Sequence, residues 1–464
     1  MKDNVYLGLI FYLTNMKIIF RLFKFFDFKV VITFFLFLTI TMTAQNDQAS
    51  LKHWEIPSKN PDRIILTFYG DPATSRAVTW RTDKSVKNGV AQIAVASESS
   101  NFTTGSINFQ AVIEPFEMGK YERNSSFNVN YHSVIFRDLK PNTIYAYRVG
   151  DGNKHWSEWI QFKTAKKEYA LTKFVYFGDA QNNVLSHWSR VIRKAYQTAP
   201  DASFVIHAGD LVNDAHRDLE WAEWHKAGGF IHGQWTAIPV LGNHEYWPLF
   251  SDDRNRYLSI HWRPQFTIPI EKDLDKKLNE TVYTTDYQDV RIIVLNSNYN
   301  LEEQTKYVEE KLKNSTAKWN IVTCHHSVFS PARGRDFEYG RKVWKPLFDK
   351  YNVDLVLNGH DHTYARGHVP EIRETNNNSK DIKTVYVTSV SGPKHYRLDI
   401  TKLNEYSNEG YELDKSAQYV QFFQVITIDK NKLTYVAYTA TGKEYDRAVI
   451  LKNPNTGKKK LLSD

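Results

Sequence analysis

Between residues 172 and 358, the sequence alternates short apolar runs with longer segments of helical periodicity. The apolar runs include "KFVYFG", "SFVIHAG", "AIPVLG", "RIIVLNS", "WNIVTC" and "VDLVLNG". The segments between them, such as residues 184–198, carry apolar residues three and four positions apart. This alternation predicts an α/β domain over residues 171–450, with helices covering a largely parallel sheet. Later runs, such as "VQFFQVITID" and "KLTYVAYTA", predict antiparallel strands.

Residues 58–165 have a different pattern, with short runs rich in β-branched and aromatic residues separated by Gly, Asp, Asn and Pro. Examples are "RIILTFYG", "SRAVTWRT" and "TIYAYRVGD". The pattern predicts an all-β sandwich, with Trp80, Tyr145 and Tyr147 packed between its two sheets. Its strand spacing resembles a fibronectin type III module.

The first 44 residues have the features of a secretory signal peptide. Lys29 precedes an uncharged, apolar run over residues 30–43, and Ala44 follows as a small residue at the expected cleavage site. The run is shorter than the about 20 residues that span a bilayer, which favours cleavage over a membrane anchor. Met16 is an alternative start. We therefore expect a secreted, periplasmic or cell-surface protein without a stable membrane span.

Composition indicates a globular protein without a nucleic-acid groove. The 27 Tyr, 27 Phe and 12 Trp can fill a core, while the net charge of +8 is spread thinly. The basic run Lys458–Lys460 is expected to be a solvated tail within residues 451–464. The only cysteine, Cys324, excludes an intramolecular disulfide and is expected to be a small buried apolar residue.

Five of the apolar runs end in carboxylate, amide or imidazole residues. Because ligands gather at the carboxyl ends of the strands in α/β sheets, these side chains should converge. Each one alone could be a helix cap, a turn former or a core imidazole. Together they predict a site for two transition metal ions, Fe, Mn or Zn, since a single structural zinc needs about four ligands. The candidate ligands are Asp179, Asp210, Asn243, His325, His360 and His362.

The motifs around these residues resemble those of a known superfamily. In order, "FGDAQ", "GDLVND", "GNHE", "VTCHH" and "GHDH" are similar to the motif series of the calcineurin-like metallophosphoesterases. The preceding sandwich makes the resemblance closer to the purple acid phosphatase branch. The resemblance implies an αββα sandwich with a dinuclear metal centre. It also implies hydrolysis of phosphate esters by in-line attack of a metal-bound hydroxide.

The resemblance also implies roles for individual ligands. Asp210 would bridge both ions, Asp179 and His362 would hold the first, and the second would be held by Asn243, His325 and His360.

Three neighbours of the ligands are assigned other roles. His244 would face the phosphate, either stabilising charge or donating a proton to the leaving oxygen. Glu245 would orient His244 or be solvated, and His326 would support the ligands without binding metal.

Two positions depart from the family pattern around the first ion. Purple enzymes have Tyr three residues after the bridging Asp, where this chain has Asn213. The wider superfamily has His two residues after the first Asp, where this chain has Gln181. Either residue could supply a neutral oxygen as a weak ligand, or water fills the position. Without the tyrosinate, purple colour is not expected and Fe(III) is not assured, so the two ions are divalent or trivalent.

Substrate binding is less defined. Plant purple enzymes have a substrate-binding His pair in the region where this chain has "SPARGRDFEYG". Arg333 or Arg335 could bind phosphate oxygens there, or the segment is an ordinary exposed loop.

The predicted function is therefore an acid phosphatase-like phosphomonoesterase acting on a small phosphate ester. Two alternatives remain open. The same metal core could serve a phosphodiesterase or nucleotidase, or the substitutions Gln181 and Asn213 could mark a non-catalytic binding protein with a degenerate site.

Overall fold

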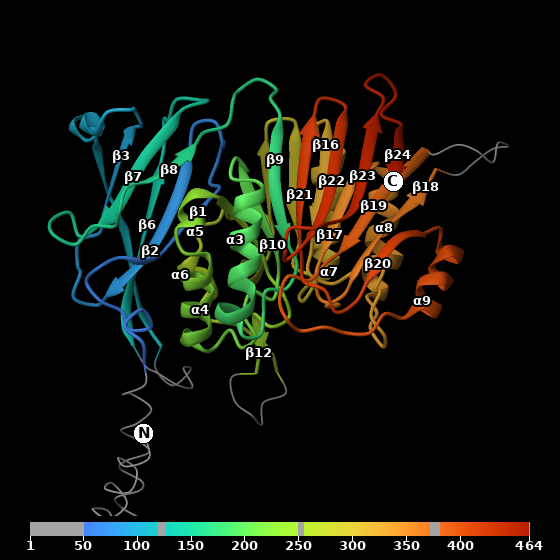
Figure 1. Ribbon diagram of the computed structural model, residues 1–464, viewed down its shortest axis with the longest axis horizontal. Coiled ribbons are helices and arrows are strands. Elements are labelled where there is room, and N and C mark those ends of the chain that lie inside the picture. Colours follow the sequence, from blue (N-terminus) through green and yellow to red (C-terminus); the bar gives the residue numbers. More distant parts are fainter. Residues whose placement is uncertain (1–50, 119–126, 249–254, 372–380, 464) are drawn as a thin grey trace, which may run out of the picture. The chain divides into compact units, whose positions relative to one another are not determined.

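The first folded region is a β-sandwich, seen in Figure 1 at the blue and teal end of the chain. The computed structural model describes residues 51–118, 127–248, 255–371 and 381–463. The expected signal peptide, residues 1–44, lies outside the described residues. One sheet contains β1 (Asp62–Thr67), β2 (Arg76–Asp83), β6 (Asn128–Phe136) and β5 (Val112–Glu117). The other contains β4 (Ile107–Gln110), β3 (Val90–Val95), β7 (Ile144–Gly150) and β8 (Ile160–Lys163).

The sandwich core confirms the aromatic residues expected between the sheets. Trp80, Tyr145 and Tyr147 belong to one buried cluster with residues of both sheets. Strands β4 and β5 were not anticipated, because most of their side chains are exposed and they lack a clear apolar alternation.

The second folded region contains two groups of strands, as the family resemblance implies, whereas the alternating pattern alone predicted a single, largely parallel sheet. The first group, in order, is β11 (Thr236–Val240), β10 (Phe204–Ala208), β9 (Thr172–Phe177), β21 (Phe422–Asp429), β22 (Lys432–Thr439), β23 (Glu444–Lys452) and β24 (Lys459–Ser463). Strands β9 to β11 are parallel and the others are antiparallel. The second group is β14 (Tyr283–Tyr287), β15 (Val290–Val294), β16 (Trp319–Thr323), β17 (Leu355–Asn358), β19 (Asp381–Thr388), β18 (Tyr364–Pro370) and β20 (Glu412–Ala417).

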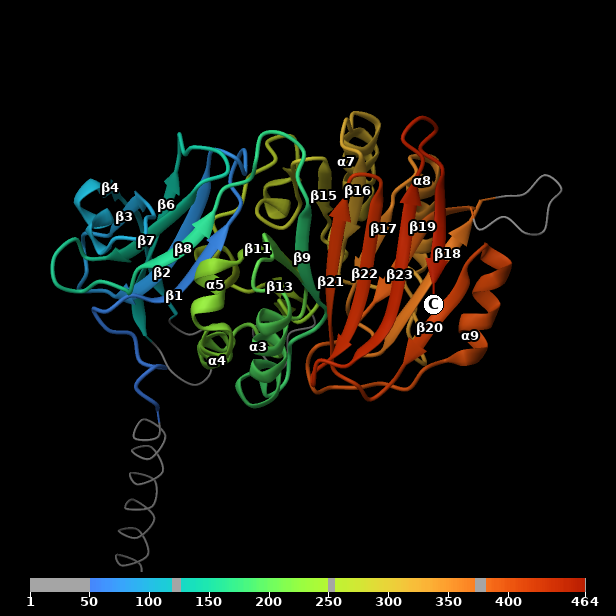
Figure 2. The same ribbon diagram turned by 45° about the horizontal axis from the view of Figure 1, so that its top comes forward.

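Helices flank both strand groups. Figures 1 and 2 show α3 (Ser189–Thr198), α4 (Asp218–Gly228) and α5 (Phe230–Gln234) beside β9 to β11. They show α7 (Leu301–Lys313) and α8 (Lys345–Lys350) beside β15 to β17. This is an all-β domain followed by a mixed α/β domain with the expected αββα layers. None of the helices within the described ranges is long and apolar enough to cross a membrane.

Shorter elements complete the described chain. Single turns of π-helix, η4 (Val184–Trp188) and η6 (Gly340–Trp344), lead into α3 and α8. The remaining elements are β12 (Tyr246–Trp247), β13 (Tyr257–Leu258), α6 (Trp262–Gln265), α9 (Ile400–Glu405), η2 (Ser100–Gly105), η5 (Lys276–Leu278) and η7 (Tyr406–Glu409).

The expectation of a solvated lysine tail is wrong, because Lys459–Ser463 forms β24 and pairs with both β23 and β19. Lys459 is fully buried, and its ammonium donates to the carbonyl of Val353 at 2.8 Å and lies 3.3 Å from Asp354. A strand hides every second side chain, so a basic run can place one lysine inward where a carboxylate and carbonyls receive it.

The two folded regions are joined by backbone pairing and by buried charges. Strand β1 of the sandwich pairs in parallel with β11. Arg63 holds both carboxylate oxygens of buried Asp218 at 2.7 and 2.8 Å, and Arg81 reaches the same carboxylate at 3.2 Å. These guanidinium groups hold the pKa of Asp218 well below its usual value, despite the opposing effect of burial.

Candidate metal centre

The predicted ligands stand just after five strands of the α/β domain and come together in space. Strands β9, β10 and β11 lead to Asp179, Asp210 and Asn243, while β16 and β17 lead to the histidines. Two sets of donor atoms have all their members within 4.8 Å of one another. The sets are Asp179, Asp210 and His362, and Asp210, His325 and His360.

Asp210 is common to both sets. Its Oδ2 lies 3.1 Å from His325 Nε2, which in turn lies 3.1 Å from Asn243 Oδ1. On the other side, Asp179 Oδ2 is 3.3 Å from His362 Nε2. All six predicted ligands thus meet around Asp210.

Two of the three candidate imidazole ligands have Nδ1 held by a backbone carbonyl. Nδ1 of His325 donates to the carbonyl of Ala208 at 2.9 Å, and Nδ1 of His362 donates to the carbonyl of Lys394 at 3.2 Å. Each bond leaves Nε2 directed at the carboxylates. A ring held in this way by a backbone carbonyl is the usual arrangement of a metal-binding histidine.

The electrostatics of the cluster favour a cation. Burial is the main cause that raises the pKa of Asp179 to about 7, and the nearby Asp210 adds to it. Burial lowers the pKa of His325, but the carboxylates of Asp210 and Asp179 outweigh it and raise that pKa to about 9. The Oδ2 atom of Asp179 is buried without a hydrogen-bond partner. Two buried carboxylates and an unpaired acceptor atom therefore fit bound metal ions.

The backbone around the ligands is specialised. Asp210, His360 and His362 have positive φ angles of 49°, 72° and 47°, a region that non-glycine residues seldom adopt. A Cβ atom on Gly242 would lie 2.2 Å from Asp210 Oδ1, and one on Gly359 would lie 2.2 Å from Asp179 Oδ1. The positive-φ turns and the absence of a side chain at Gly242 and Gly359 therefore let the two carboxylates occupy their positions in the cluster.

The structure distinguishes the two substitutions at the first ion. Gln181 reaches the cluster, with Nε2 3.0 Å from Asp210 Oδ2 and 2.9 Å from His362 Nε2, while its Oε1 is buried without a partner. The side chain of Asn213 instead accepts a hydrogen bond from Asn182 Nδ2 at 2.9 Å. Of the two predicted weak ligands, only the Gln181 side chain is thus brought into contact with the ligand set.

His244 faces Asp210 from the side of the cluster. Its backbone N–H donates to Asp210 Oδ1 at 2.8 Å, and its Nε2 is 3.9 Å from Asp210 Oδ2. Nδ1 donates to the carbonyl of Asn213, and the ring stacks on Trp247 with 5.2 Å between centroids. The ring is held firmly, with Nε2 directed at the cluster.

The expectation for Glu245 is wrong on both alternatives, because this side chain is buried and bonds to backbone. Its carboxylate accepts from the N–H groups of Asp210 at 3.0 Å, Leu211 at 2.9 Å and Gly242 at 2.7 Å. Burial, with a smaller effect of Asp210, raises its pKa to about 8. Glu245 therefore ties the β10 and β11 loops together. His326, by contrast, bonds to Ser297 at 2.8 Å and lies beside His360, as expected for a supporting residue.

Arg335, Lys394 and Tyr396 border the cluster and form what we call the basic rim. Arg335 is one of the two arginines predicted to bind phosphate. The Nη2 atom of Arg335 donates to the Tyr396 hydroxyl at 3.0 Å, and Nη1 contacts His360 Nε2. Arg333 instead lines a separate surface hollow with Asp399 and other residues.

Sequence reasoning missed Lys394 and Tyr396, which complete this rim. The Lys394 ammonium lies 5.6 Å from the Tyr396 ring centre, and the Arg335 guanidinium lies 4.7 Å from the same centre. The positive charge of Lys394 acts on both His244 and His362 and contributes to lowering the pKa of each, although burial is the main cause. The segment "SGPKHY", directly after β19, was the available signal.

Comparisons with known proteins agree with this geometry. Residues 61–164 match the family model of the purple acid phosphatase N-terminal domain, and residues 172–364 match that of the calcineurin-like phosphoesterases. An uncharacterized protein of Mycobacterium tuberculosis is 26% identical over 348 residues, covering 66% of this chain. The chain spans 62% of the length of that relative.

Named relatives include acid phosphatase type 7 of Mus musculus, 25% identical over 67% of this chain and 72% of the relative. Among solved structures, a purple acid phosphatase from yellow lupin (Lupinus luteus) seeds has the same fold, with a TM-score of 0.67 and 19% identity over 86% of this chain and 76% of the lupin chain. The chain therefore carries a purple acid phosphatase N-terminal domain over residues 61–164 and a calcineurin-like phosphoesterase domain over residues 172–364.

Proposed function

We propose that this protein is a metal-dependent phosphomonoesterase that hydrolyses small phosphate esters at the cluster around Asp210. The observation that carries the proposal is the shared carboxylate, because Asp210 belongs to two separate sets of potential metal donors. This arrangement fits two ions held side by side. Its likeness to acid phosphatases of the same family supports the reaction class.

The ligand assignment follows from the two sets. Asp179, Asp210 and His362 would hold the first ion, and the second would be held by Asp210, Asn243, His325 and His360. Fe, Mn and Zn all accept such oxygen and imidazole ligands. Ions of this kind neutralise charge on phosphate oxygens and make water a stronger acid, so that a hydroxide nucleophile is available near neutral pH.

Gln181 would complete the first site with its amide oxygen. The amide of a glutamine presents an oxygen or a nitrogen after a half-turn of its terminal bond, and the Oε1 atom of Gln181 is already buried without a partner. A neutral oxygen stabilises a trivalent ion less than a tyrosinate does. We therefore expect a colourless protein with divalent ions in both positions.

His244 would act on the leaving group. Because Nδ1 is occupied by the carbonyl of Asn213, only Nε2 can face the substrate. Because Nδ1 keeps its own proton, the ring is protonated at both nitrogens when Nε2 donates a hydrogen bond or a proton to the ester oxygen as its bond to phosphorus breaks. Stacking on Trp247 holds the ring in place while this happens.

Arg335 and Lys394 would bind the phosphate group. Within the described part of the chain, neither forms an ion pair with a carboxylate, so both leave positive charge beside the cluster. A neutral imidazole has one lone pair, so the Arg335 contact with His360 weakens once that ring binds an ion. The guanidinium is then free for phosphate oxygens. A dianionic monoester gains more from these two cations than a monoanionic diester does.

The proposal is tested by comparing p-nitrophenyl phosphate with bis(p-nitrophenyl) phosphate, using protein loaded in turn with Fe, Mn and Zn. We expect the monoester to have the higher kcat/KM with at least one metal. A higher value for the diester would instead support a phosphodiesterase. No turnover of either ester by fully metal-loaded protein would support a binding protein.

Export remains a proposal as well. Amino-terminal sequencing of the mature protein from the host should give a chain that begins at or near Gln45.

A further inference from the structure

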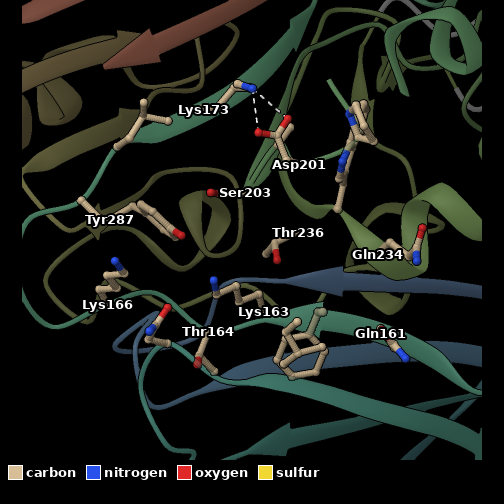
Figure 3. Close-up of a pocket in the computed structure, with 18 of the residues that line it drawn as sticks. Gln161, Lys163, Thr164, Lys166, Lys173, Asp201, Ser203, Gln234, Thr236 and Tyr287 are labelled. Carbon is tan, nitrogen blue, oxygen red and sulfur yellow. Dashed lines mark hydrogen bonds and ion pairs between the residues drawn. The ribbon is translucent and has the colours of Figure 1, made fainter. Parts of the chain in front are cut away.

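We propose a second ligand site, remote from the metal cluster, in which a cavity between the β-sandwich and the α/β domain binds a small phosphate-bearing anion. The cavity has a volume of about 410 Å³ and is shown in Figure 3. This proposal does not depend on the catalytic activity proposed above.

The cavity lies at the amino ends of the strands whose carboxyl ends carry metal ligands. Lys173 near the start of β9, Ser203 just before β10 and Thr236 at the start of β11 line one wall. The opposite wall comes from the end of β8 and from the segment that connects it to β9, which includes Lys163 and Lys166. A ligand here would contact both folded regions at once, and domain interfaces are a common place for small-molecule sites.

The charge of the cavity is positive. Its lining contains three lysines and one carboxylate, Asp201, which is occupied by Lys173 at 2.7 and 2.8 Å. In the described residues, Lys163 and Lys166 have no carboxylate partner. Two ammonium groups therefore remain available for an anion.

Two largely buried residues, Thr236 and Tyr287, direct their hydroxyl groups into the same space. Thr236 is only 1% exposed and Tyr287 is 6% exposed. In Figure 3 both side chains point into the hollow, together with the ammonium of Lys163. Each hydroxyl can donate a hydrogen bond to a ligand oxygen.

A third cation lies behind the cavity wall. Arg76 is fully buried, and its Nε and Nη1 atoms have no hydrogen-bond partner. Its Nη2 donates to the carbonyl of Lys163 at 3.3 Å, and its guanidinium lies 5.4 Å from the centre of the Phe162 ring, which lines the cavity. An anion in the cavity would be attracted by this charge.

These features select the ligand class. The volume suits a small molecule and excludes a macromolecule as the occupant. Ammonium and hydroxyl groups converging on one space match the oxygens of a phosphate group, while Leu171 and Trp235 offer apolar contact to an organic body. Inorganic phosphate and an organic phosphomonoester share this chemistry, and the experiment separates them.

The experiment measures lysine acetylation by mass spectrometry of the metal-loaded, full-length protein. Inorganic phosphate or phenylphosphonate, a stable monoester analogue, is added, and chloride at equal ionic strength is the reference. Acetylation of Lys163 and Lys166 should slow at least about threefold, as expected when a ligand fills most of the site. Exposed Lys432, on β22, should react at an unchanged rate. The labels are read at individual lysines, so anions bound at the metal cluster do not interfere.

Variants then test the walls of the site. In Thr236→Val and in Lys163→Met, protection of Lys166 should be lost, whereas Lys432→Met should keep it. Stronger protection by phenylphosphonate identifies an organic phosphomonoester as the ligand, and equal protection identifies free phosphate. Unchanged acetylation of Lys163 and Lys166 with both anions would overturn the proposal, as would full protection of Lys166 in both wall variants. Ester hydrolysis is measured in parallel, so a catalytically inactive protein that still shows protection would contradict only the proposed function.

Discussion

The amide of Gln181 lies 3.0 Å from Asp210, the carboxylate shared by both candidate metal sites. Gln181→Ala should therefore weaken the first site selectively. We expect a loss of about 10- to 100-fold in affinity for one of two ions, as is common when a supporting or weak ligand is removed. Metal content by mass spectrometry and chelator competition provide the measurement. Asn213→Ala is the matched control, since its side chain bonds to Asn182, and equal losses in both variants would contradict the assignment.

His244→Ala should keep both ions and lose rate. The ring supplies no donor to either metal set, and its Nε2 lies 3.9 Å from Asp210 Oδ2 at the side of the cluster. Removing a group that donates a proton costs about 10²- to 10⁴-fold in kcat. Steady-state kinetics with metal analysis checks this, and exposed His187→Ala is the control. Loss of metal from His244→Ala would instead show that His244 supports the metal site and does not act on the leaving group.

Arg335→Met and Lys394→Met should each raise KM for a monoester more than for a diester. Each removes a cation next to the cluster, at a cost of about 1–3 kcal/mol for a charge-assisted hydrogen bond. Arg333→Met is a control from the same segment, because that side chain lines a separate hollow. The ratio of kcat/KM for the two esters is the readout, and a ratio equal to that of the control would rule out the phosphate-binding role.

Three buried histidines should each contribute a loss of stability as the pH falls below about 6.5. His207, His225 and His232 are buried among tryptophans, and burial lowers the pKa of each, to about 4 for His232. In the unfolded chain the same ring titrates near 6.5, so the unfolded state binds more protons between pH 6.5 and 4. His232 alone accounts for up to about 3 kcal/mol over that window. Urea unfolding at pH 7 and pH 5 should show the loss, and His232→Phe should reduce it.

Asp218→Asn should destabilise the protein strongly. The substitution removes the negative charge that pairs with the buried guanidinium groups of Arg63 and Arg81. Removing one partner of a buried ion pair typically lowers the free energy of unfolding by about 3–5 kcal/mol. Asp286→Asn, which breaks an exposed pair with Arg291, should cost no more than about 1 kcal/mol. Denaturant unfolding measures both, and similar losses in the two variants would contradict the importance of burial.

The sequence predicted the site residues most accurately where the topology of the sheet determines which residues meet. The ends of parallel strands meet, so Asp179, Asp210 and His360 could be grouped before any coordinates were known. The sequence could not separate Gln181 from Asn213, because the choice depends on Asn182, which holds the Asn213 side chain away from the cluster. A motif gives spacing along the chain and leaves side-chain direction undetermined.

Other misses have similar causes. Glu245 looked like a partner of His244 because the two are adjacent, yet its bonds run to backbone groups of two loops. Lys394 and Tyr396 approach the cluster from a segment remote along the chain. Lys459 resembled a solvated lysine because its partner, Asp354, is about a hundred residues away.

The pairing of β1 with β11 makes the sandwich more than an appended module. A shortened chain beginning after β8 would leave the first two residues of β11, Thr236 and Ala237, without this pairing, on a strand whose side chains are all buried. Such an uncovered edge invites pairing with a second molecule and aggregation. The sandwich therefore acts as a cap for the α/β domain, and solubility would be the first property lost on its removal.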